Sequence, residues 1–243
     1  MAVIPAGVPV AHTLEWMAEV LPDGARKILE VGCGQGALAA SMAKRGIIVT
    51  AIDSDPASVE ATRARGVQAI LTHFMDFDAT PFHAVLFTRS LHHMRNLAPV
   101  MERAFKLVAP GGTLLLEEFA HERADAATAA WFYEERERLS LAGRIHDEEP
   151  WQPGADPLER WKAHHAERGV QEGNAMRTAV SKKFRVIGQE SVPYLYRWFA
   201  DRLPADPTGG HETLALFEAE RQGIAAKRLA PIGFRVVGRA LLP

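Results

Sequence analysis

The chain has 243 residues, with 28 Lys plus Arg against 30 Asp plus Glu and a net charge of −2. That length can bury the full core of one α/β domain, and the 47% hydrophobic content excludes a disordered chain. The balanced charge disfavours a nucleic-acid binder, and no apolar run approaches the roughly 20 residues of a membrane helix. With one cysteine and no leader-like start, we expect a cytoplasmic protein without disulfides.

Strand-like and helical patterns alternate through the first half of the chain. Apolar runs predict strands over residues 27–31, 47–52, 67–71, 84–88 and 113–119. Helices are predicted over residues 38–44, 56–65 and 97–108, the last from apolar residues spaced three and four apart. This alternation predicts a parallel sheet covered by helices on both faces.

The second half of the chain does not continue the regular alternation of strands and helices. We predict a helix over 123–141 followed by one or two shorter helices, a strand over 184–193, a helix over 211–229 and a strand over 233–241. The predicted fold is α/β: a doubly wound, Rossmann-like, mostly parallel seven-stranded sheet with a helical lid insertion. Its expected parts are an N-terminal helix (1–24), a ligand-binding half (25–120), the lid (121–183) and the last two strands with their inserted helix (184–243).

The strongest motif is ILEVGCGQG at residues 28–36, where a predicted strand runs into Gly32, Gly34 and Gly36. Glycines here allow a tight turn and let a ligand approach the peptide groups and the helix N-terminus. The segment also fits the dinucleotide pattern G-x-G-x-x-G/A through Ala37. Asp53, at the tip of the second predicted strand, does not distinguish the cofactors, because either kind offers ribose hydroxyls to a carboxylate.

Three features favour a cationic nucleoside cofactor over a dinucleotide. Glu30 places a carboxylate at the end of the first strand, where it repels a pyrophosphate and attracts an ammonium or sulfonium. Asp76 and Phe77 follow the third strand and offer a carboxylate for an exocyclic amine beside an aromatic ring. The order of elements after the fourth strand leaves no separate hydride-acceptor domain.

These residues resemble the class I S-adenosylmethionine-dependent methyltransferases, strongly over about residues 25–120 and weakly over 184–243. The resemblance rests on the E-x-G-x-G-x-G loop, on TRSLHHM after the fourth strand and on the P-G-G turn at 110–112. It implies S-adenosylmethionine as cofactor and S-adenosylhomocysteine as product, with the methionine moiety along the loop, Asp53 on the ribose, and Asp76 and Phe77 on the adenine. The cofactor-binding residues it implies are Glu30, Gly32, Cys33, Gly34, Gly36, Asp53, Ser54, Asp76, Phe77 and Arg89.

Three side chains at the expected carboxyl edge of the sheet are candidates for catalysis. His92 or His93 can remove a proton from a hydroxyl or ammonium acceptor, or the pair can simply shape the loop. Glu117, or Glu118 beside it, can orient a hydroxyl or neutralise a cationic acceptor, or the two can be a solvated strand-end pair or a helix-capping charge. Arg89 can also bind a carboxylate acceptor through two parallel hydrogen bonds, or form an internal ion pair. Cys33 is expected to pack without a nucleophilic role.

Further residues are candidates for an acceptor pocket, although core packing explains the lid tryptophans equally well and is the favoured interpretation of Trp16. They are Trp16, Trp131, Tyr194 and Arg197, with Trp151 and Trp161 as further tryptophans of the expected lid. His164, His165 and the acidic run at 147–149 lack the i, i+4 spacing of a helical metal site, so no metal is expected.

The methyl acceptor is expected to be a small molecule, because residues 89–92 read Arg-Ser-Leu-His where base-modifying relatives carry Asn/Asp-Pro-Pro-aromatic. We predict methyl transfer by in-line displacement to oxygen or nitrogen, catalysed by a monomer or homodimer that binds no nucleic acid and no membrane. An NAD-dependent oxidoreductase and a non-catalytic S-adenosylmethionine-binding module are the alternatives.

Overall fold

The computed structural model of the chain describes residues 3–146 and 154–240. The strands are β1 (Lys27–Val31), β2 (Ile48–Asp53), β3 (Gln68–Leu71), β4 (Phe82–Thr88), β5 (Val108–Phe119), β6 (Arg185–Val192) and β7 (Gly233–Arg239). The α-helices are α1 (Gly7–Val20), α2 (Ala37–Lys44), α3 (Pro56–Ala64), α4 (Leu97–Leu107), α5 (Ala126–Leu141), α6 (Pro157–Arg168), α7 (Gly173–Lys183), α8 (Leu195–Ala200) and α9 (Pro207–Ala225). Two 3-10 turns, η1 (Leu91–His93) and η2 (His121–Arg123), complete the set. Trp151 and the acidic run at 147–149 lie outside the described residues.

The strands form one sheet in the order β3-β2-β1-β4-β5-β7-β6. β1 pairs in parallel with β2 and β4, β2 with β3, and β4 with β5. β7 runs antiparallel to β5, because the Ala240 amide bonds to the Gly112 carbonyl at one end and the Ala120 amide bonds to the Ile232 carbonyl at the other. The prediction of a mostly parallel seven-stranded sheet is therefore confirmed.

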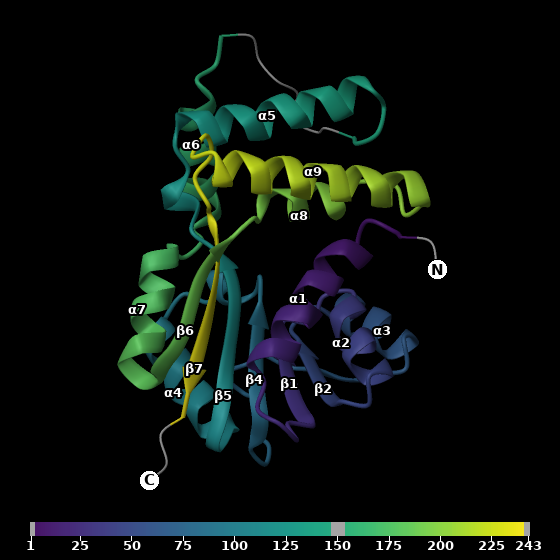
Figure 1. Cartoon of the computed structure of the whole chain (residues 1–243). Coiled ribbons are helices and arrows are strands. Elements are labelled where there is room, and N and C mark those ends of the chain that lie inside the picture. The colour runs from purple at the N-terminus through teal and green to yellow at the C-terminus, as the bar shows by residue number, and fades with distance from the viewer. Residues whose placement is uncertain (1–2, 147–153, 241–243) are drawn as a thin grey trace. The chain divides into compact units, whose positions relative to one another are not determined.

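The chain divides into two compact units. The sheet unit comprises residues 12–118, 171–190 and 235–243. In this unit α4 and α7 cover one face of the sheet, and α1, α2 and α3 cover the other (Figure 1). The central strands carry fully buried side chains such as Ile28, Leu29 and Phe87. Because parallel strands covered on both faces must be apolar throughout, β1 and β4 read as nearly continuous hydrophobic runs.

The helical unit comprises residues 1–11, 119–170 and 191–234. In it α5, α8 and α9 run alongside one another (Figure 1), and α6 packs on α5. The buried ring of Phe132 contacts Trp161, Trp198 and Phe199 with centroid distances of 5.1 to 5.4 Å. The division differs from the predicted lid of residues 121–183. Helix α7 belongs to the sheet unit, and α8 and α9 join α5 and α6.

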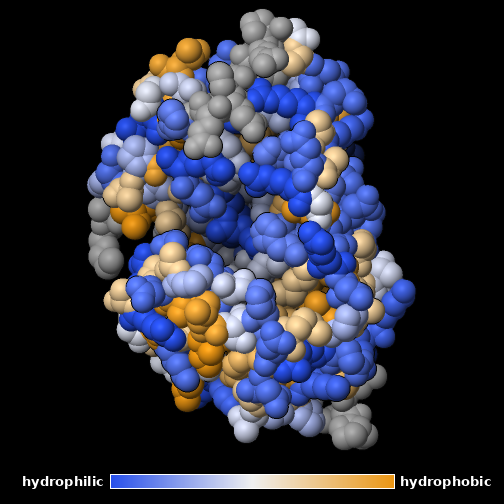
Figure 2. All heavy atoms as spheres, turned by 180° about the vertical axis from the view of Figure 1, so that it is seen from behind, coloured by the Kyte–Doolittle hydropathy of each residue, from blue (hydrophilic) through white to orange (hydrophobic). Residues whose placement is uncertain are grey.

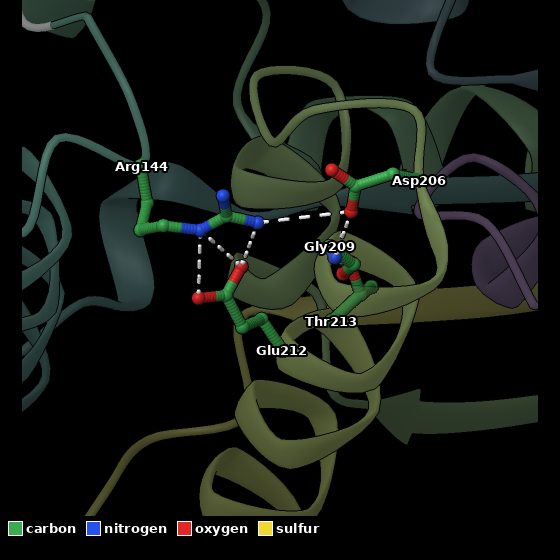
Figure 3. A network of polar contacts seen from close by, with 5 residues as sticks. All are labelled: Arg144, Asp206, Gly209, Glu212 and Thr213. Carbon is green, nitrogen blue, oxygen red and sulfur yellow. Dashed lines mark hydrogen bonds and ion pairs between the residues drawn. The ribbon is translucent and has the colours of Figure 1, made fainter.

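A polar network joins the end of α5 to α9 within the helical unit (Figure 3). The Arg144 Nε lies 3.0 Å from both carboxylate oxygens of Glu212, and its Nη2 lies 3.7 Å from Asp206. Asp206 also caps α9 by accepting a hydrogen bond of 2.7 Å from the Gly209 amide. The Thr213 hydroxyl donates to the Gly209 carbonyl inside the first turns. An N-cap bond of this kind stabilises a helix by about 1 kcal/mol.

The structure differs from the predicted elements at three places. β5 begins at Val108 instead of residue 113, because Val108 pairs with Phe82 before a register shift in β4. Helix α9 begins at Pro207 instead of residue 211. Helix α8 was not predicted. Its N-terminal amides, from Tyr194 to Tyr196, donate to the carboxylate of Glu220 on α9 at 2.7 to 3.0 Å.

The surface of the described residues is predominantly hydrophilic on the face in Figure 2. Large hydrophobic side chains are exposed at Val3, Ile4, Ile48, Leu71, Met75, Leu141, Ile187 and Leu214. Among the helices that the structure describes, none combines the length and apolarity required to cross a bilayer.

Candidate active site

The glycine loop follows β1 and turns towards α2 in the sheet unit. The Gly32 and Cys33 amides donate to the Ile52 carbonyl of β2 at 2.9 and 3.1 Å. Gly32 has a φ of +75°, and a Cβ there would lie 2.5 Å from the Cβ of Ser90. Gly34 has a φ of +51°, and a Cβ there would meet no atom within 4 Å. The loop therefore packs tightly at Gly32 and faces open space at Gly34.

Asp53 at the end of β2 holds the loop from the side. Its Oδ2 accepts a hydrogen bond of 2.9 Å from the Gly34 amide, and its Oδ1 accepts one of 3.0 Å from the Asp55 amide. An ionised carboxylate has about four acceptor positions, so each oxygen keeps capacity for another donor. The side chain is half-buried and is fixed in a position from which it can accept bonds from a diol.

A cavity of about 620 Å³ opens beside Gly34 and Asp53. It lies where the strand order reverses between β1 and β4, which is the usual ligand crevice of an open α/β sheet. Its volume is within the range of about 300 to 1,000 Å³ of small-molecule sites. The lining residues are Val31, Gly32, Gly34, Ile52, Asp53, Ser54, Thr72, His73, Phe74, Met75, Arg89, Ser90, His93, Met94, Arg95, Asn96, Pro99 and Val100. Six predicted site residues are among them: Gly32, Gly34, Asp53, Ser54, Arg89 and His93.

The two predicted adenine contacts lie outside the cavity lining. Asp76 is exposed and Phe77 is buried against Phe82, with ring centroids 6.3 Å apart, and neither residue lines the cavity. Residues 72–75, immediately after β3, line it instead. The turn is pinned by Arg103 of α4, which donates to the carbonyl oxygens of Phe74 and Phe77. Asp76 was chosen from the sequence because a carboxylate can accept from an exocyclic amine, and residues 72–75 were not considered.

Glu30, Cys33 and Gly36 also lie outside the cavity lining. Glu30 is 2% exposed, and burial together with the negative Asp53 raises the pKa of its carboxyl to about 8. The sequence interpretation gave Glu30 a negative charge, whereas this shift favours its neutral form. The Cys33 thiol lies 3.4 Å from the Thr62 hydroxyl, and burial raises its pKa to about 11. Cys33 is buried in the loop, and its lack of a nucleophilic role stays a prediction.

The two adjacent histidines have different surroundings. His92 is buried, and its Nδ1 lies 2.8 Å from the Glu118 carboxylate at the end of β5. Glu118 also accepts hydrogen bonds from the backbone amides of Leu91 and His92. His93 is exposed and lines the cavity, with its ring centroid 4.0 Å from that of His92. The sequence treated the pair as equivalent, whereas the structure brings only His93 to the cavity.

Glu117 has a structural set of partners and does not line the cavity. The side chain is fully buried. One carboxylate oxygen accepts from the Thr13 hydroxyl of α1 at 2.6 Å, and the other pairs with the Arg235 guanidinium of β7 at 2.7 Å. Arg235 also donates to the carbonyl of His12. Glu117 therefore ties α1 to the sheet, and we withdraw it as a catalytic candidate.

The predicted acceptor-pocket residues pack against other side chains of their own units. Trp16 on α1 is 4% exposed, with the Arg235 guanidinium 5.1 Å from its ring. In the helical unit, Trp131 packs against the aromatic core, Tyr194 stacks on Phe119 at 4.7 Å, and the buried Arg197 lies over the Tyr196 ring. None of the four lines the cavity of the sheet unit.

The helical unit contains a second histidine cluster. The rings of His121 and His165 stack in parallel with centroids 4.8 Å apart, and His165 Nδ1 lies 2.8 Å from the Trp161 carbonyl. Burial lowers the pKa of His165 to about 4. Within residues 3–146 and 154–240, no three His, Cys, Asp or Glu side chains are grouped as a metal site.

Sequence reasoning missed the segment after η1 as part of the site. Met94, Arg95 and Asn96 line the cavity together with the first turn of α4. The segment is held by Gln171, whose backbone amide donates to the His92 carbonyl and whose side chain donates to the Arg95 carbonyl. The sequence feature that could have indicated these residues is their position directly after the fourth strand, at the carboxyl edge of the sheet.

Comparison with known proteins identifies the family. A family model of the methyltransferase domain matches residues 9–147. A ubiquinone biosynthesis O-methyltransferase of Psychrobacter cryohalolentis is 33% identical over 102 residues, which cover 37% of this chain and 40% of that protein. One from Alkalilimnicola ehrlichii is 28% identical over 195 residues, 75% of this chain and 77% of that protein. The N-methyltransferase NodS of Bradyrhizobium japonicum, solved with S-adenosylhomocysteine, has a TM-score of 0.55 at 14% identity and covers 97% of this chain and 88% of its own.

The chain thus belongs to the methyltransferase domain family. Its sheet order and glycine-loop cavity are those of the class I S-adenosylmethionine-dependent methyltransferases, as predicted, and S-adenosylmethionine is the cofactor of that class. The cavity fits this cofactor, since it combines open space at Gly34 with a fixed carboxylate at Asp53 for a ribose diol. The family match removes the basis for an NAD-dependent oxidoreductase.

Proposed function

We propose that the protein transfers a methyl group from S-adenosylmethionine to an oxygen or nitrogen of a small-molecule acceptor. The observation that carries the proposal is the cavity at the reversal of strand order, with Gly34 and Asp53 on its wall. The cofactor supplies a methyl group that its sulfonium already activates. The chain must therefore align the acceptor with that methyl group and exclude water.

Each end of the cofactor has a proposed set of contacts. Asp53 accepts hydrogen bonds from the ribose hydroxyls, next to Ser54. Residues 72–75 surround the adenine, in place of the Asp76 and Phe77 that the resemblance implied. The loop at Gly32 and Gly34 runs along the methionine moiety. Arg89, whose guanidinium can form two parallel hydrogen bonds with a carboxylate, binds the carboxylate of that moiety.

His93 is the proposed base for a hydroxyl or ammonium acceptor. It is exposed at the cavity, and an ordinary imidazole changes its protonation near neutral pH. His92 is instead a positioning residue, because its ring is held by Glu118 and packs against His93. Substitution of His93 should lower kcat, whereas substitution of His92 should affect KM and stability as well.

The small size of the acceptor is supported by the named relatives. The ubiquinone biosynthesis enzymes are O-methyltransferases, and NodS is an N-methyltransferase. The balanced net charge also argues against a nucleic-acid acceptor. We further propose a cytoplasmic location and action as a monomer or homodimer.

The test is methyl transfer from radiolabelled S-adenosylmethionine to a panel of small phenols, amines and acids. We expect the label in one or more of these products and a loss of at least tenfold in rate for His93→Gln. Labelling of RNA or protein alone would refute a small-molecule acceptor. Binding of S-adenosylhomocysteine with no transfer to any acceptor class would favour the non-catalytic binding module.

A further inference from the structure

The charges that line the cavity are unbalanced. Among the described lining residues, Arg89 and Arg95 carry positive charge and Asp53 is the one carboxylate. Asp53 already accepts hydrogen bonds from two backbone amides, and the ribose is its proposed ligand. The sulfonium adds a further positive charge when the cofactor is bound. Because the proposed function assigns the carboxylate of the methionine moiety to Arg89, no carboxylate among the described lining residues is left for Arg95.

The other carboxylates at this edge of the sheet do not correct the imbalance. Glu118 is fully buried and engaged by His92 and two backbone amides. Glu117 is fully buried and paired with Arg235. Neither side chain lines the cavity. The two acidic groups that the sequence suggested for a cationic acceptor are therefore used inside the fold.

Arg89 and Arg95 sit on a backbone segment that is held from both sides. Arg89 has a left-handed φ of +56°, which is strained for a residue with a side chain, and its amide donates to the Glu117 carbonyl at 3.0 Å. Gln171 donates to the carbonyl of Arg95 at 3.0 Å. A fixed backbone reduces the conformational freedom that a guanidinium loses when it binds an anion.

The two arginines differ in their side-chain surroundings. Arg89 is half-buried beside the loop, which suits the carboxylate of the cofactor. Arg95 is exposed, and within the described part of the chain its guanidinium has no ion-pair or hydrogen-bond partner. A guanidinium fork matches the geometry of a carboxylate, with two parallel hydrogen bonds.

We propose that the methyl acceptor carries a carboxylate and that Arg95 recognises it. This inference rests on the proposed function and adds the chemical class of the substrate. Arg95 acts as a specificity residue: it binds the carboxylate and leaves the hydroxyl or amine of the same molecule for the methyl group. Its removal should weaken binding of anionic acceptors and leave binding of S-adenosylhomocysteine unchanged.

The test uses benzoate and benzamide, which have the same shape and differ in charge. Each is titrated calorimetrically into the protein saturated with S-adenosylhomocysteine. The variants are Arg95→Gln, Arg95→Lys and the control Arg45→Gln, since Arg45 is an exposed arginine at the end of α2, outside the cavity. We expect benzoate to bind about tenfold more tightly than benzamide in the native protein and in Arg45→Gln. The ratio should fall close to one in Arg95→Gln and be partly retained in Arg95→Lys.

Equal affinities in the native protein, or a ratio unchanged by Arg95→Gln, would overturn the inference. The initial saturation with S-adenosylhomocysteine separates this result from failure of the proposed function. If the product does not bind, the proposed function fails and the inference with it. If the product binds and the charge ratio is absent, the inference alone is wrong.

Discussion

Gly32 and Gly34 offer a matched pair of substitutions that separates folding from cofactor binding. Both have left-handed φ angles, so alanine at either position costs about 1 to 2 kcal/mol of backbone strain. At Gly32 the new methyl group would also lie 2.5 Å from Ser90 Cβ. Relief of such an overpacked contact typically costs about 1 to 3 kcal/mol more. At Gly34 the methyl group would meet no atom within 4 Å and would occupy space beside the cavity.

The assay is thermal unfolding of Gly32→Ala and Gly34→Ala, with and without saturating S-adenosylhomocysteine. The cost of the contact with Ser90 predicts that, without ligand, Gly32→Ala unfolds about 2 to 12 °C below Gly34→Ala. This range assumes that each kcal/mol of destabilisation lowers the unfolding temperature by about 2 to 4 °C. The native protein should gain about 2.7 kcal/mol from ligand at 100 times its Kd, whereas Gly34→Ala should gain little. Equal stabilities of the two variants, or full stabilisation of Gly34→Ala by ligand, would refute this account of the loop.

Three further predictions follow from single side chains. Asp53→Ala should weaken S-adenosylhomocysteine binding by about tenfold to hundredfold in calorimetry, because it removes a charged hydrogen-bond acceptor, and unchanged affinity would exclude Asp53 from the site. Arg235→Met should lower the free energy of unfolding by about 3 to 5 kcal/mol in urea, since it removes the guanidinium that neutralises the buried Glu117; a loss below 1 kcal/mol would contradict that. Burial lowers the pKa of His165 from 6.5 to about 4, so the unfolded chain binds the extra proton between these values. The free energy of unfolding should have its full value above pH 6.5 and fall by up to about 3 kcal/mol towards pH 4. His165→Leu should reduce this dependence of the free energy of unfolding on pH.

Local patterns predicted the sheet unit well. The apolar runs of β1, β2 and β4 predict buried strands, because both faces of the sheet are covered. The apolar stripe of α4 predicts a helix, because α4 buries one side. Gly34 and Asp53 were predicted from equally local signals, namely a glycine loop after a strand and an acid at the tip of the next strand. These positions line the cavity in the structure.

The residues that prediction misplaced depend on contacts distant in sequence. Glu117 was a catalytic candidate because the sequence does not show that Arg235, 118 residues later, neutralises it. His92 and His93 are identical in type, and only the fold turns one towards Glu118 and the other towards the cavity. Helix α8 depends on Glu220 of another helix for its N-terminal amides.

The most direct test of the account is calorimetric titration of the native protein with S-adenosylhomocysteine and, separately, with NAD. We expect one S-adenosylhomocysteine site per chain, with affinity lost in Asp53→Ala, and no binding of NAD at the same concentrations. Binding of NAD alone, or of neither ligand, would contradict the assignment of the cavity to S-adenosylmethionine.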